Sequence, residues 1–64
     1  MVDYAERARL YRERAAEAQA KAETMKSAST REALVLVAAD YLSMAEAMEQ
    51  IADSKRAIRG EISN

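Results

Sequence analysis

The chain has 64 residues with ten basic and eleven acidic side chains, a net charge of −1, and neither cysteine nor histidine. The lack of cysteine excludes disulfides and thiolate metal sites, and the lack of histidine removes the commonest general base and transition-metal ligand. The balanced charge is not typical of nucleic-acid-binding domains, which usually carry a basic excess. We therefore expect a non-enzymatic protein with no cofactor and no metal site.

A first helix is expected over residues 4–26. Asp3 followed by Glu6 fits a capping box, and Lys21 and Lys26 suit the negative end of the helix dipole. The apolar residues of this segment alternate steps of four and three, as in a heptad seam. The members of the predicted seam are Tyr4, Ala8, Tyr11, Ala15, Ala18, Ala22 and Met25.

A break is expected at residues 27–29, where poor helix formers are densest. Ser29 followed by Glu32 fits a second capping box, which predicts a new helix from about residue 30. One continuous helix remains the alternative, because neither glycine nor proline interrupts the chain here.

The second helix is expected over residues 30–59, with Gly60 as its stop. Its seam is assigned to the large apolar residues, and the small residues of the first helix are expected to face them. These seam positions are Leu34, Val37, Tyr41, Met44, Met48, Ile51, Lys55, Ile58 and Ile62, with Ala38, Ala45 and Ala52 widening one side and Ala33 and Ala47 the other. The predicted fold is all-α, a single antiparallel two-helix hairpin over residues 1–64.

The segment "ALVLVAADYL", residues 33–42, contains more apolar side chains than one seam can cover. Nine of its ten residues are apolar, and Asp40 is the exception. A chain this short is marginal alone, and oligomerisation is a common remedy. We expect a homodimeric four-helix bundle, and a different protein partner is the alternative. The predicted interface residues are Leu10, Leu34, Val35, Leu36 and Leu42.

Four arginines, Arg7, Arg9, Arg12 and Arg14, form the most concentrated basic stretch. Acidic residues are interleaved with them, which favours a solvated, ion-paired helix face. The alternative function is a small regulatory RNA- or DNA-binding bundle that uses this stretch.

An acidic stripe in the second helix contains Glu46, Glu49 and Asp53. Carboxylates so spaced can hold a hard cation, but a di-iron bundle site would need histidine. A solvated helix face is therefore the preferred interpretation.

The sequence shows no targeting or membrane segment. No run approaches 18 apolar residues, and the charged start lacks the apolar core of a signal peptide. These features favour a cytoplasmic protein with no membrane contact.

Two stretches, "YRERAAEAQAKAE" from Tyr11 and "REALVLVAADYLSMAEAME" from Arg31, carry a family resemblance. They resemble small alanine-rich helical-hairpin proteins of unknown function from alpha-proteobacteria. The turn differs, because that group often carries Asp-Pro where this chain reads Ser-Ala-Ser-Thr. The resemblance implies a helical hairpin and a bacterial origin, and it implies no residue chemistry. The matching residues are Tyr11, Arg12, Arg14, Ala15 and Glu17, then Leu34, Ala38, Tyr41, Ala45 and Glu46.

Overall fold

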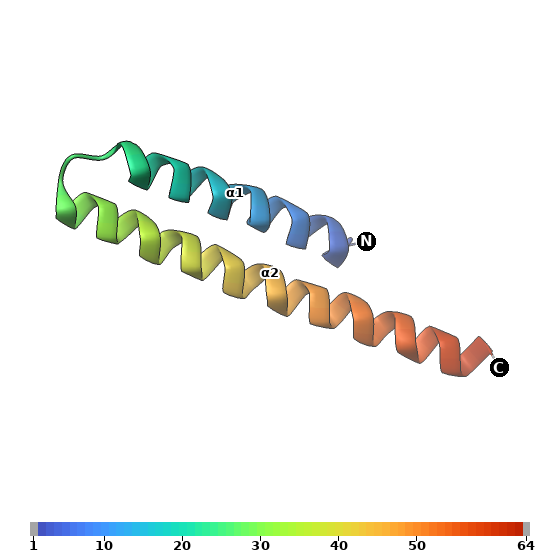
Figure 1. The fold of residues 1–64 in the computed structure, drawn as a ribbon. Coiled ribbons are helices and arrows are strands. Elements are labelled where there is room, and N and C mark those ends of the chain that lie inside the picture. Colours follow the sequence, from blue (N-terminus) through green and yellow to red (C-terminus); the bar gives the residue numbers. More distant parts are fainter. Residues whose placement is uncertain (1, 64) are drawn as a thin grey trace.

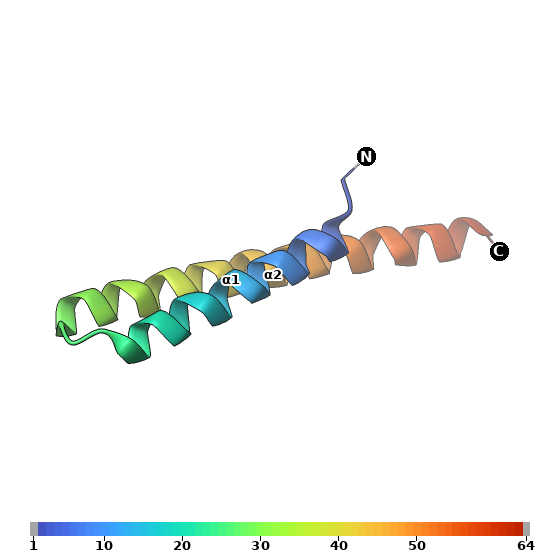
Figure 2. The same ribbon diagram turned by 90° about the horizontal axis from the view of Figure 1, so that it is seen from above.

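The computed structural model describes residues 2–63, with side chains through residue 58. Within this range the chain forms two helices and no strand, α1 (Tyr4–Thr24) and α2 (Ala28–Ser63). The helices lie side by side and run in opposite directions, joined by residues 25–27 (Figures 1 and 2). The prediction of an all-helical hairpin is confirmed, and the continuous-helix alternative is wrong.

The ends of α1 are fixed by local hydrogen bonds. At its start, the Asp3 carboxylate accepts from the backbone N–H of Glu6 at 3.1 Å, as its role as N-cap requires. At its end, the Thr24 hydroxyl donates to the Lys21 carbonyl at 2.9 Å, and Met25 is already extended. The helix therefore ends two residues before the predicted position 26, because Thr24 caps a carbonyl that a longer helix would bond internally.

The start of α2 depends on Ser27, and the prediction of Ser29 as N-cap is wrong. The Ser27 hydroxyl accepts from the backbone N–H of Thr30 at 3.4 Å, and the Ser27 carbonyl accepts from the backbone N–H of Arg31 at 3.0 Å. The Arg31 guanidinium donates to the Met25 carbonyl at 3.0 Å and closes the turn. The connection thus spans 25–27 instead of the predicted 27–29.

The far end of α2 continues beyond α1. The prediction that Gly60 stops this helix is wrong, because the helix runs through it to Ser63. A glycine costs a helix only about 1 kcal/mol, which does not force an end. The Lys55 ammonium lies 4.8 Å from the centroid of the Tyr4 ring. Residues 56–63, about 12 Å of helix, therefore extend past the start of α1 (Figure 1).

The contact between the helices is a seam of alanines. Ala45 and Ala38 are 0% and 1% exposed, and the larger side chains lie at the edges of the contact. The prediction that Val37, Met44 and Ile51 fill this seam is wrong, because these side chains remain about two-fifths exposed. Small residues face small residues, which lets the two backbones approach closely. The buried members of this alanine seam are Ala8, Ala15, Ala18, Ala22, Ala38 and Ala45.

Candidate self-association surface

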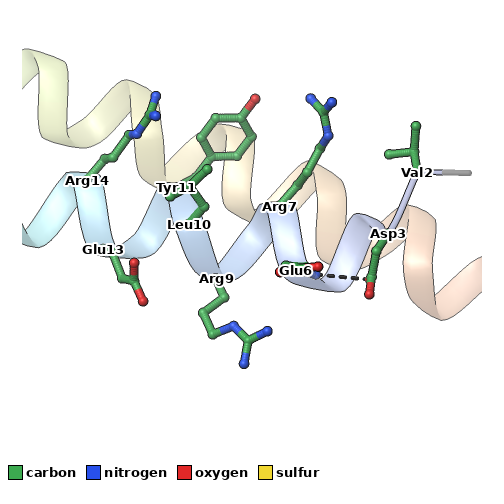
Figure 3. A pocket seen from close by; sticks show the side chains of 9 residues that line it. All are labelled: Val2, Asp3, Glu6, Arg7, Arg9, Leu10, Tyr11, Glu13 and Arg14. Atoms are coloured by element: carbon green, nitrogen blue, oxygen red, sulfur yellow. Dashed lines mark hydrogen bonds between the residues drawn. The ribbon is translucent and has the colours of Figure 1, made fainter.

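A stacked pair of tyrosines marks one edge of the alanine seam. The rings of Tyr11 and Tyr41 lie with centroids 6.1 Å apart and an angle of 26° between their planes. Both side chains are half-buried. Tyr11 points to the same side of α1 as Arg7 and Arg14 (Figure 3). We call this edge of the hairpin the tyrosine side.

An apolar stripe follows the tyrosine side along α2. Its four members recur every seven residues, so they fall on one line of the helix. Val37 lies one turn before Tyr41, which places this line next to the stacked rings. We call these residues the α2 stripe; their exposed fractions are Val37 41%, Met44 39%, Ile51 37% and Ile58 55%.

The opposite edge of the seam carries an ion pair between the helices. The Arg12 guanidinium donates to both carboxylate oxygens of Glu49, with Nη2–Oε1 at 2.6 Å and Nε–Oε2 at 2.9 Å. This hydrogen bonding lowers the pKa of Glu49 and raises the pKa of Arg12. Both side chains are exposed to solvent, so the pair fixes the geometry of the hairpin more than its stability.

The residues predicted as an oligomer interface do not all lie on one surface. Leu42 is half-buried against the seam alanines, and Leu34 is half-buried as well. Val35 is two residues from Val37, so the two side chains project from opposite sides of α2. Leu36 is 66% exposed and lines a hollow together with Val35, so these two predicted interface residues do lie side by side.

We call the edge of the seam that carries the Arg12–Glu49 pair the Arg12 side. A shallow hollow on this side contains Val35, together with Gln19, Ala22 and Glu23. A different hollow forms on α1 around Leu10, which is 43% exposed, and Arg7, Tyr11 and Arg14 are among its lining residues (Figure 3). The structure therefore separates Leu10 from Val35.

The structure brings three of the four arginines predicted as a nucleic-acid contact into one hollow and directs the fourth elsewhere. Arg7, Arg9 and Arg14 all line the hollow around Leu10, with Arg7 and Arg14 on one side of α1 and Arg9 on the other (Figure 3). Arg12 turns toward α2 and bonds Glu49. Glu6 and Glu13 line the same hollow, so the surface that the nucleic-acid alternative would use is mixed in charge.

Two of the three members of the acidic stripe of α2 are paired with basic residues. Glu49 bonds Arg12, and Asp53 lies 3.6 Å from the Arg56 guanidinium. In the part of the chain that the structure describes, no three carboxylates gather as metal ligands would. Nor does either helix, over those same residues, have the length and hydropathy that crossing a membrane requires.

No family model matches this sequence, and no similar curated protein or solved structure was found. The resemblance to alpha-proteobacterial helical hairpins stays a prediction. Any function must therefore be inferred from the surface of the hairpin itself.

Proposed function

We propose that this protein is a structural or protein-interaction module that self-associates, with two hairpins forming a homodimeric four-helix bundle. The observation that carries the proposal is the size contrast between the alanine seam and the tyrosine side. The described residues that are fully buried are all alanines, while the α2 stripe remains exposed. A second copy on the tyrosine side would cover the stripe together with the stacked rings of Tyr11 and Tyr41.

The energetics favour such a second contact. Alanine offers one methyl group, and burial is worth only about 0.8 kcal/mol per such group. Fully burying a Val, Met or Ile side chain contributes about 1.5–3 kcal/mol each. Val37, Met44 and Ile51 lose part of this contribution in the single hairpin, because each is more than one-third exposed. A chain without cysteine gains most by placing them against another subunit.

The test measures molar mass by light scattering over a wide concentration range, with helicity followed by circular dichroism. We expect a dimer that Met44→Glu dissociates, because this substitution puts a charge into the proposed interface. Ser43→Glu is the matched control: it adds the same charge one residue away, at an exposed position turned from the tyrosine side. This control should remain dimeric.

Two outcomes would overturn the proposal. A fully helical monomer at every concentration would show that the hairpin needs no second copy. Dissociation by Val35→Glu, with Met44→Glu still dimeric, would place the contact on the Arg12 side instead.

A further inference from the structure

A charged stripe runs along α1 next to the tyrosine side. Its residues alternate steps of four and three, so they lie on one face of the helix. All six are exposed, and Arg7 and Arg14 within it point to the side of Tyr11 (Figure 3). We call this set the α1 stripe; its members are Asp3, Arg7, Leu10, Arg14, Glu17 and Lys21.

The charges of the α1 stripe have no ion-pair partner within the described hairpin. The ion pairs there join Arg12 to Glu49 and Arg56 to Asp53, and none involves the stripe. The Asp3 carboxylate accepts a backbone N–H, which leaves its charge uncompensated by a side chain. The stripe therefore presents a fixed order of charges to whatever lies against it.

That order is complementary to itself when it is reversed. Along α1 the stripe reads acidic, basic, apolar, basic, acidic, basic. A second copy lying antiparallel places Asp3 opposite Lys21 and Arg7 opposite Glu17. A parallel copy in the same register places every charge opposite its own kind. Charges flanking a helix–helix seam set orientation and partner in this way.

We propose that α1 of one copy packs antiparallel against α1 of a second copy through this stripe, about a two-fold axis level with Arg12. The proposal rests on the self-association proposed above and specifies its surface and register. An isologous contact of this kind repeats each pairing twice, once on either side of the axis.

The same register accounts for Leu10, the one apolar residue of the stripe. It lies opposite Arg14 of the second copy, whose aliphatic stem can cover it while the guanidinium reaches solvent. The open hollow around Leu10 provides room for such a side chain.

The two-fold axis also organises the rest of the bundle. Tyr11 is adjacent to Arg12 in sequence and stacks on Tyr41, so the stacked pairs of both copies meet near the axis. With α1 against α1, the remaining antiparallel contact joins α2 to α2. The α2 stripe then faces its own copy, in the up-down arrangement of four-helix bundles.

The test mixes two charge-reversed variants, Arg7→Glu and Glu17→Arg. Each variant alone has two like-charge pairs in its homodimer, and we expect its dimer affinity to fall about tenfold, or about 1.4 kcal/mol. In a heterodimer of the two variants both pairs become attractive. We therefore expect an equimolar mixture to recover the dimer in sedimentation, and any helicity lost by the separate variants.

The mixture isolates the contact between copies. Within one chain, Arg7→Glu puts a carboxylate beside Asp3, and Glu17→Arg puts a guanidinium beside Lys21. Mixing cannot repair these local effects, so recovery must come from the second copy.

The control pair is Arg9→Glu with Glu23→Arg, which changes the net charges equally. Arg9 borders the hollow around Leu10, but its side chain points to the other side of α1 from Arg7 and Arg14, and Glu23 lines the hollow with Val35. Each control should dimerise like the native chain, alone or mixed.

If the native chain is dimeric but mixing Arg7→Glu with Glu17→Arg restores no dimer, this register is wrong and self-association still stands. A native chain that stays monomeric would overturn both proposals.

Discussion

The alanine seam and the tyrosine side are two edges of one hairpin, and they use side chains of opposite size. In the seam, alanines bring the backbones of α1 and α2 together, with Ala45 fully buried. On the tyrosine side, the larger residues Val37, Met44 and Ile51 stay partly exposed. The difference teaches that close helix contact and extensive apolar burial are separate tasks. The hairpin performs the first with alanine, and the second is what the proposed contact between copies would supply.

The largest loss of stability is expected from Ala45→Leu. The added carbons have no space where the helices touch, and such overpacking typically costs about 1–3 kcal/mol of unfolding free energy. Urea unfolding followed by circular dichroism measures this loss. Ala39→Leu adds the same atoms at an exposed position of α2 and should change stability by less than about 0.5 kcal/mol. Equal losses in the two variants would show that the seam is not tightly packed.

A smaller loss of stability is expected at the N-cap of α1. Asp3→Ala removes the carboxylate that accepts from Glu6, which should cost about 1 kcal/mol and fray the first turn of α1. Thermal unfolding measures the loss. Asp53→Ala removes an exposed carboxylate from mid-helix and should cost less. Equal melting temperatures for Asp3→Ala and Asp53→Ala would show that the cap contributes no special stability.

In residues 56–63, where α2 extends past α1, a substitution is expected to increase stability. Because Gly60 lies within the helix, Gly60→Ala should raise helicity and stabilise the chain by at most about 1 kcal/mol. Circular dichroism at low temperature detects the added helix. A loss of stability would instead favour the helix stop predicted from the sequence.

The smallest effect concerns the Arg12 side and appears only in acid. Since the pKa of Glu49 is lowered in the fold, the Arg12–Glu49 pair stabilises the hairpin above the ordinary glutamate pKa. Its contribution is lost as the pH falls through the lowered pKa. Between pH 6 and about pH 3, the native chain should therefore lose slightly more stability than Glu49→Gln.

Urea midpoints at the two pH values test this difference. Identical pH slopes for Glu49→Gln and the native chain would contradict the expectation.

The helical hairpin was predictable because helix-forming residues dominate and one cluster of poor formers interrupts them. The α2 seam was predicted only in part. Leu34, Tyr41 and Met48 are half-buried, as expected of seam positions. Val37, Met44 and Ile51 were assigned to the seam for their size but remain exposed. A signal for the correct phase was present in the sequence. Alanines recur every seven residues on both helices, and matching the two series identifies the seam. These series are Ala8, Ala15 and Ala22 in α1, and Ala38, Ala45 and Ala52 in α2.

Other features could not be read from the sequence, for physical reasons. Ser27 and Ser29 offer the same hydroxyl as a cap, and the choice depends on how the turn closes over Met25. Pairing of Arg12 with Glu49, 37 positions apart, requires the register of the two helices. That register also decides that Val35 and Leu10 lie on different surfaces, although both read as surplus apolar residues.

The tyrosines also give the molecule an optical property. The chain has three tyrosines and no tryptophan or phenylalanine, so its near-ultraviolet circular dichroism comes from tyrosine alone. Tyr11 and Tyr41 are stacked, and the Tyr4 ring lies beneath the Lys55 ammonium. All three chromophores thus sit where α1 meets α2. Separation of the helices changes this spectrum without any added label, independently of the far-ultraviolet signal of the helices themselves.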